Sequence, residues 1–506
     1  MFRCSIVCCL FASLIVLPAQ AQGTETTQGG ETTQGGETTQ SSGVPLESPS
    51  TQESSEVPQA PDDSATEFVV SEGALTDDEI ANGPYAAHNA WMLTCCVLVL
   101  FMVAPGLAMF YGGLVRRKNV LSVLMQCIFL MGLMTVIWAL YGYSLSFGGS
   151  GGWIGDLEYV FMNGVQREWN GEEPVTPMEG NITRMTHMLF QGMFFIITPA
   201  LICGAFAERI KFSSMVVFSI LWGTLIYCPL CHWVWDDGPL AYSAGENAIA
   251  GALDFAGGTV VHISSGVSAL MAAILIGPRM GYLKEPIQPH NLTYTALGAA
   301  MLWVGWFGFN AGSQLASDGL TSSAFATTHF AAAAGAVCWA LTEWGVLGKP
   351  TVLGASSGAV AGLVCITPAA GFVHPLPALL MGAIAGAVCY LACSKLKHAL
   401  KYDDALDAFG VHGVGGTIGA ILTGVFATRE CANVNEGAPV GLIDGGSFSL
   451  MIGQVVAVLI TFAFAGIGSL ILLKVIDLAI GLRVTAEAEQ RGLDITDHGE
   501  EGYMLA

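Results

Sequence analysis

Long apolar segments, separated by short polar stretches, occupy most of the chain after about residue 88. Eleven segments have the length and apolar character of membrane-spanning helices: 90–113, 120–147, 185–207, 212–235, 258–277, 293–314, 323–346, 352–370, 374–396, 409–427 and 449–473. A helix of about 20 apolar residues crosses the hydrocarbon core of a bilayer. The pattern therefore predicts an all-α polytopic membrane protein with 11 transmembrane helices, in a membrane domain of residues 85–480.

The composition agrees with this prediction. Of the 506 residues, 53% are hydrophobic, only 11% are charged, and 63 are glycine. Soluble domains carry about 25% charged residues. Small residues let transmembrane helices approach closely, so the many glycines suit a packed helical bundle.

The chain before the first span has a different character. Residues 1–21 resemble a signal peptide, with Arg3, an apolar core and Ala19-Gln-Ala21 as a cleavage site; an uncleaved helix is the alternative. Residues 22–84 hold 13 acidic and no basic residues, more than half of the net charge of -22. This low-complexity composition predicts a disordered tail, extracellular or periplasmic. Without a basic patch, nucleic-acid binding is not expected.

Basic residues predict the orientation of the spans. With the mature amino terminus outside, the inner loops and the carboxyl-terminal tail hold 14 Lys and Arg, and the outer loops hold only Arg167, Arg184 and Arg429. Loops with an excess of Lys and Arg face the cytosol. We therefore expect an N-out, C-in topology, with residues 481–506 forming a cytosolic tail.

Two histidines lie in similar surroundings, in the fifth and tenth spans. His262 ends Asp254-Phe-Ala-Gly-Gly-Thr-Val-Val-His262, and His412 lies in Asp407-Ala-Phe-Gly-Val-His412-Gly-Val-Gly-Gly416. Units of five spans must be inverted relative to each other, so an inverted 5+5 repeat with one extra helix is expected. An isolated buried histidine is readily a packing residue, but two in repeat-related positions favour a functional site between the repeats.

The motifs resemble those of the ammonium transporter (Amt/Mep/Rh) superfamily, bacterial-type Amt branch. The resemblance covers about residues 88–506, in order. Besides the two histidine segments, the matching motifs are Gly112-Gly-Leu-Val-Arg-Arg-Lys-Asn119, Gly204-Ala-Phe-Ala-Glu-Arg209, Gly305-Trp-Phe-Gly-Phe-Asn-Ala-Gly-Ser313 and Gly481-Leu-Arg-Val484.

This resemblance implies a homotrimer with one pore in each subunit, and ammonium as the substrate with methylammonium as its analogue. It implies that His262 and His412 face each other in the pore and share a hydrogen bond. An outer recruitment site is implied by Phe194, Trp235 and Ser313, and a phenylalanine gate below it by Phe190 and Phe309. For Trp235 alone, an interfacial anchor is the alternative.

The implied mechanism follows from the cost of placing a bare cation in an apolar tube. If ammonium loses a proton at the gate, neutral ammonia crosses while the proton passes separately along the histidines. Potassium has no proton to lose and is refused. An apolar pore disfavours charged imidazolium, so neutral rings are expected.

Acidic residues near the histidines leave two interpretations open. Asp254 either contacts the ion directly or caps the helix that begins near Ala256, and it is essential in both cases. Asp407 occupies the repeat-related inner position and is expected to be structural. Glu208 and Arg209 are expected to form a polar network at the inner face.

Other classes of function find less support. Cys228-Pro-Leu-Cys231-His232 has the spacing of a haem attachment site, but it ends a predicted span and is better explained by packing. We expect no metal, no cofactor and no enzymatic activity. The alternatives are an ammonium sensor that signals through the tail, and an Rh-like neutral gas channel. The resemblance implies a PII-type signal protein as a partner of the tail, and a bacterial cell (inner) membrane as the location.

Overall fold

The computed structural model describes residues 73–149, 152–432 and 439–503. The predicted signal peptide and most of the predicted acidic tail lie outside these ranges. Among the described residues, ten helical runs are long and apolar enough to cross a membrane, and the shorter apolar helix α13 (Val352–Ile366) makes the eleventh. The all-α prediction with 11 transmembrane helices is confirmed.

Several spans consist of consecutive helical pieces. The first five are α3 (Tyr85–Phe101), η1 (Met102–Leu107) and α4 (Ala108–Leu114); α5 (Val120–Ile137), η3 (Trp138–Gly142) and α6 (Tyr143–Phe147); α7 (Arg184–Phe206); α8 (Phe212–Trp222), η5 (Gly223–Tyr227) and α9 (Cys228–Trp235); and η7 (Gly258–Ile263) with α10 (Ser264–Ile276). The others are α11 (Leu292–Gly312); α12 (Gly319–Leu347); α13; α14 (Pro375–Leu391), η8 (Ala392–Leu396) and α15 (Lys397–Leu400); η9 (Phe409–Gly413) with α16 (Val414–Phe426); and α18 (Phe448–Ile480).

Helix α13 is shorter than the apolar run that contains it. The sequence stays apolar to Ala370, but the helix ends at Ile366, two residues before Pro368. Proline has no N–H to donate and restricts the residue before it, so helices tend to end at this point. The predicted span 352–370 is therefore correct as an element but four residues too long.

The two histidine helices cross at glycines. A Cβ on Gly266, four residues after His262, would meet the backbone nitrogen of Gly413. Reciprocally, a Cβ on Gly416, four residues after His412, would lie 3.0 Å from Cβ of His262. Both helices also begin with a π-helical segment that contains the histidine. These matching contacts are those expected of two related halves that meet at their fifth helices.

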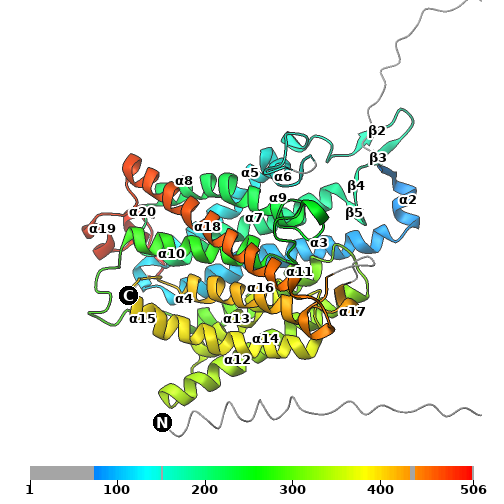
Figure 1. The fold of residues 1–506 in the computed structure, drawn as a ribbon. Helices are drawn as coiled ribbons and strands as arrows, with labels where there is room; N and C mark the ends of the chain where they lie inside the picture. Colours follow the sequence, from blue (N-terminus) through cyan, green and yellow to red (C-terminus); the bar gives the residue numbers. More distant parts are fainter. Residues whose placement is uncertain (1–72, 150–151, 433–438, 504–506) are drawn as a thin grey trace, which may run out of the picture. The chain divides into compact units, whose positions relative to one another are not determined.

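Short strands gather at one end of the long helices, and the carboxyl-terminal helices gather at the other (Figure 1). The strands are β1 (Leu75–Thr76), β2 (Glu168–Trp169), β3 (Pro174–Thr176), β4 (Met178–Glu179) and β5 (Ile182–Thr183); they form the sheet β1-β3-β2 and the pair β4-β5. The remaining short helices are α2 (Asp77–Asn82), η2 (Arg117–Asn119), η4 (Val160–Met162), η6 (Gly245–Asn247), α17 (Arg429–Ala432), η10 (Leu442–Asp444), α19 (Ala486–Arg491) and α20 (Leu493–His498).

Part of the stretch predicted as a disordered tail is folded. β1 pairs with β3, and Thr76 and Glu79 form a capping box at the start of α2. Arg167 Nη2 lies 2.6 Å from an oxygen of Asp77. The prediction for 22–84 is therefore wrong for residues 75–82, because local capping and pairing with β3 stabilise a segment that has little apolar surface of its own.

Candidate functional site

A cavity of about 120 Å³ lies at the strand end of the helices, and we call it the outer cavity. Its lining residues are His187, Gln191, Phe194, Trp235, Phe255, Ser313 and Leu315. The three residues predicted as a recruitment site thus come together from α7, from the end of α9 and from the residue after α11. The sequence alone did not single out His187 or Gln191.

The geometry of the outer cavity offers ring faces and an oxygen acceptor. The rings of Phe194 and Trp235 are nearly perpendicular, with centroids 5.7 Å apart. The hydroxyl of Ser313 donates to the carbonyl oxygen of Phe309 at 2.8 Å, which commits its proton and leaves its lone pairs available. A small cation is attracted both to aromatic faces and to such an oxygen.

Phenylalanines separate the outer cavity from the interior. The ring centroids of Phe194 and Phe309 are 4.3 Å apart, and those of Phe190 and Phe194 are 5.0 Å apart. All three side chains are almost fully buried. Phe194 lines the outer cavity and Phe309 lines the next one, so the ring contact between them lies between the two cavities. Phe190, which is predicted to form the gate with Phe309, contacts Phe194 and lines neither cavity.

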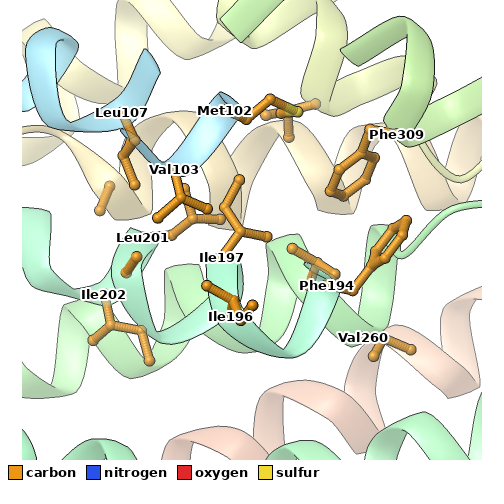
Figure 2. Close-up of a cluster of buried hydrophobic side chains, with 14 of the residues drawn as sticks. Met102, Val103, Leu107, Phe194, Ile196, Ile197, Leu201, Ile202, Val260 and Phe309 are labelled. Carbon is orange, nitrogen blue, oxygen red and sulfur yellow. The ribbon is translucent and has the colours of Figure 1, made fainter. Parts of the chain in front are cut away.

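Below these rings lies a narrow apolar cavity, which we call the central cavity. Its volume of about 10 Å³ is close to the smallest that holds one water molecule. It is lined by Met102, Leu107, Phe110, Ile197, Leu201, Val261, His262, Leu302, Trp306, Phe309, Val360 and His412. Figure 2 shows part of the apolar wall, with Met102 and Leu107 from η1 and Ile197 and Leu201 from α7.

The two predicted histidines face each other in this cavity. Nδ1 of His412 lies 3.3 Å from Nδ1 of His262, and the ring planes differ by 24°. The ring of His262 also stacks on Trp306, with centroids 5.4 Å apart. A hydrogen bond between two Nδ1 atoms requires one ring to be protonated on Nδ1 and the other, if neutral, on Nε2. Such a hydrogen bond would hold the two neutral rings in opposite tautomers.

Asp254 holds the start of the first histidine helix. Its carboxylate accepts hydrogen bonds from the backbone N–H groups of Gly257, Gly258 and Thr259 at 2.8, 2.6 and 2.7 Å, and from the hydroxyl of Thr259. Its backbone carbonyl accepts Trp235 Nε1–H at 3.0 Å. The geometry therefore places Asp254 as a cap, and Asp254 does not line the outer or the central cavity.

The counterpart of Asp254 in the second half is Asp404, not Asp407 as the sequence analysis proposed. Asp404 precedes His412 by eight residues, as Asp254 precedes His262, and its Oδ2 accepts the N–H of Phe409 at 2.7 Å. Burial raises the pKa of Asp404 to about 6. Asp407 instead pairs with Lys397 at 2.7 Å. The spacing of eight residues was the signal that could have identified Asp404.

A larger cavity of about 470 Å³, the inner vestibule, lies on the other side of His412. Its walls include the ion pair of Lys397 with Asp407, together with Arg279 and Glu343. His412 lines both the central cavity and this vestibule. The central cavity and the vestibule therefore share a lining residue, whereas the outer and central cavities are linked by the ring contact of Phe194 with Phe309.

The predicted network around Glu208 and Arg209 is confirmed. Glu208 is fully buried and pairs with Arg116 at 3.0 Å and with Arg279 at 3.1 Å. Burial alone would raise the pKa of Glu208, but the guanidinium groups of Arg279 and Arg116 outweigh it and lower that pKa. Arg209 donates to three backbone carbonyl groups, including that of Asp403 at 2.5 Å.

The cysteine motif in α9 has a packing environment. Cys228 and Cys231 are buried free thiols, and Nδ1 of His232 lies 2.9 Å from an oxygen of Asp236. Within residues 73–149, 152–432 and 439–503, no three metal-ligating side chains form a cluster.

Comparison with known proteins agrees with this arrangement. A model of the Ammonium Transporter Family matches residues 90–503. The ammonium transporter of Bacillus subtilis is 47% identical over 409 residues, which cover 81% of this chain and 96% of that protein. This chain belongs to the ammonium transporter family.

Solved structures of family members share the fold. The crystal structure of Mep2 from Saccharomyces cerevisiae aligns with a TM-score of 0.71 at 33% identity, covering 79% of this chain and 88% of that chain. A protein described as a Sensor Amt Protein aligns with a TM-score of 0.72 at 26% identity, covering 82% and 99% of the two chains. The family resemblance inferred from the motifs is thus confirmed.

Proposed function

We propose that this multi-pass membrane protein transports ammonium, with recruitment of the cation, its deprotonation, and separate passage of ammonia and the proton. The observation that supports this most strongly is the order of the sites. An aromatic cavity with an oxygen acceptor is followed by packed phenylalanines, a narrow apolar cavity and a histidine pair.

Recruitment takes place in the outer cavity. The ring faces of Phe194 and Trp235 attract a cation, and the free lone pairs of Ser313 accept one of its N–H groups. Methylammonium keeps the charge and three N–H groups, so it serves as an analogue. Because the aromatic set is complete, the geometry favours a cation site over an Rh-like neutral gas channel.

Deprotonation follows from the narrowness of the next cavity. A central cavity of about 10 Å³ has no space for a hydration shell, and its walls are mostly apolar. Moving a bare ion into such a place costs much more than moving neutral ammonia. We infer that Phe190 and Phe309 separate the charged and neutral states of the substrate.

The histidine pair gives the proton a route of its own. With Nδ1 atoms 3.3 Å apart, a proton that reaches one ring can displace the shared proton to the other ring. The released proton leaves from His412, which lines the inner vestibule. Potassium cannot divide into a neutral molecule and a proton, so it is refused at the gate.

The orientation is N-out and C-in, in a bacterial cell (inner) membrane. The basic residues that predict this orientation include Lys118, Arg279 and Lys397, which lie at the end of the helices where α19 and α20 are docked. A reporter fused near Gly171 should be detected outside and one at Ala506 in the cytosol. An external Ala506 would overturn this part of the proposal.

The carboxyl-terminal tail is proposed to be regulatory and to meet a PII-type protein in a homotrimeric assembly. Helix α19 is held to the membrane domain by Glu489. The carboxylate of Glu489 accepts the N–H of Met280 at 2.7 Å, and its backbone carbonyl accepts Lys118 Nζ at 2.8 Å.

Cross-linking in membranes, followed by mass determination, tests the trimer: only monomers at every cross-linker dose would contradict it. Co-purification with PII from nitrogen-replete cells tests that partner, and no enrichment relative to a tail-deleted chain would contradict it.

A sensor is the second candidate function, favoured by the similarity to the Sensor Amt Protein. Electrical current separates the two. In proteoliposomes of purified protein, a transporter should give a saturable inward current with ammonium and methylammonium and none with potassium. Saturable ammonium binding without current would favour the sensor.

A further inference from the structure

Gln191 lies in the wall of the outer cavity, one turn before Phe194 on α7. Its side chain is only 8% exposed, and its Oε1 is buried without a hydrogen-bond partner. Its amide nitrogen makes no hydrogen bond to the described part of the chain either. Buried amide groups almost always have partners. The amide of Gln191 therefore has no partner in the described part of the chain that would hold it in one orientation.

The other walls indicate the chemistry of that molecule. Ser313 presents an oxygen whose proton is already donated to Phe309, and Phe194 and Trp235 present rings. Lys and Arg are absent from the lining of this cavity. The surroundings therefore suit a small cation that carries hydrogen-bond donors.

A primary amide can turn either end toward the cavity, but only its carbonyl oxygen can accept a hydrogen bond from such a cation. A half-turn of the terminal amide exchanges Oε1 and Nε2 and leaves the rest of the side chain in place. The carbonyl oxygen can thus turn from its unpaired buried position toward the cavity. An amide oxygen that accepts from a cation forms a charge-assisted hydrogen bond, which is stronger than a neutral one.

We propose that Gln191 is a ligand-contact residue of the outer cavity, whose amide oxygen accepts an N–H hydrogen bond from the recruited ammonium. Ser313 and Gln191 then provide two directional acceptors, and the rings of Phe194 and Trp235 provide the non-directional attraction. This inference rests on the proposed transport of ammonium and adds a contact to its recruitment step.

The test is the concentration dependence of ammonium-driven current for Gln191→Met, a side chain of equal length without an amide. Loss of a hydrogen bond to a charged ligand should raise the apparent KM roughly tenfold to hundredfold, with maximal current little changed. Gln191→Glu keeps an oxygen acceptor, so its KM should be similar to the wild-type value or below it. If Gln191 only filled space, Gln191→Glu would not have a lower KM than Gln191→Met.

Gln126 offers a matched control. It is also a buried glutamine in a transmembrane helix, 1% exposed, with Oε1 unpaired, but it does not line the outer cavity. Gln126→Met should leave the KM for ammonium unchanged. An equal rise in KM for the Gln126 and Gln191 variants would overturn the inference.

Two further measurements keep the result decisive. If Gln191→Met does not reach the membrane, Gln191→Asn takes its place. It withdraws the amide by one methylene and should still raise KM, and a wild-type KM in either variant refutes the contact.

Trp235→Leu distinguishes a failure of the Gln191 contact from a failure of the proposed transport. A raised KM for Trp235→Leu with an unchanged KM for Gln191→Met rejects only the role of Gln191, whereas absence of ammonium current in the wild type rejects transport itself.

Discussion

Asp254 connects the outer cavity to the histidine pair through two different groups. Its backbone carbonyl accepts the indole N–H of Trp235, and its carboxylate accepts hydrogen bonds from the first residues of the helix that carries His262. One residue therefore fixes the ring of Trp235 and the helix of His262 relative to each other. We therefore expect transport to require Asp254 as a positioning residue that does not line the outer or the central cavity.

Replacement of Asp254 tests this positioning role. Asp254→Asn keeps one oxygen acceptor where the wild type uses two, so we expect slower transport and a lower melting temperature. Asp254→Ala loses all the side-chain acceptors and should have a larger effect, since a helix cap alone is worth about 1 kcal/mol. The measurements are ammonium flux and the thermal melt of the purified protein. Abolished flux with an unchanged melt in Asp254→Asn would instead indicate direct contact of the carboxylate with the ion.

The proposed recruitment of ammonium predicts a role for the ring of Trp235. Trp235→Leu retains apolar bulk but removes one cation–aromatic contact of about 0.5 to 2 kcal/mol, which corresponds to a roughly 2- to 30-fold weaker apparent affinity for ammonium. The concentration dependence of current in proteoliposomes measures this change. An unchanged affinity would return Trp235 to the role of an interfacial anchor.

At the scale of elements, the crossing of the two histidine helices sets the distance between the rings. The helices meet where Gly266 faces Gly413 and where Gly416 faces His262. Because the backbones touch at these points, the imidazoles four residues away are brought within hydrogen-bonding distance. Close contact of small residues is a common device in membrane helices.

Addition of one methyl group at the crossing should therefore separate the histidines. Gly266→Ala is expected to destabilise the protein by about 1–3 kcal/mol and to reduce ammonium flux, because its Cβ overlaps the backbone of Gly413. Gly132→Ala is the control, since Gly132 lies within helix α5 and a Cβ there has no atom within 4 Å. Thermal melts and flux at matched protein levels compare the two. Equal behaviour of both variants would show that the crossing tolerates a side chain.

Hydropathy predicts the elements well because each membrane span needs a long apolar run. The span 212–235 was predicted with the bounds observed for α8 to α9, whereas 352–370 was too long because apolar character continues past Pro368. The recruitment and pore residues were assigned through motifs of the family. Neither method could identify Gln191, because an unpaired amide becomes visible only when all its neighbours are placed.

At the scale of the whole molecule, the carboxyl-terminal tail is attached to the same network that surrounds Glu208. The N–H of Val484 donates to the carbonyl of Arg209 at 3.1 Å, and the N–H of Leu493 donates to Asn119 Oδ1 at 2.9 Å. Asn119 in turn donates to Glu208 at 3.1 Å. Since Arg279 both pairs with Glu208 and lines the inner vestibule, the tail and the vestibule share contacts.

Truncation after Gly481 tests whether this attachment affects transport. It leaves α18 complete and removes the contacts of Val484, Glu489 and Leu493. We expect normal insertion into the membrane and impaired ammonium flux. Glu500→Gln is the control, because this exposed residue lies after α20 and should leave flux unchanged. Full ammonium flux in the truncated protein would show that transport does not require the tail.

In the proposed mechanism the proton has a separate route along His262 and His412. We would test this route by recording the current driven by ammonium and by potassium for His262→Asn and His412→Asn, at matched protein levels. Each replacement interrupts the line of ring nitrogens, so we expect either loss of ammonium current or the appearance of potassium current. Wild-type ammonium current together with wild-type refusal of potassium in both variants would contradict the proton relay and leave the histidines as packing residues.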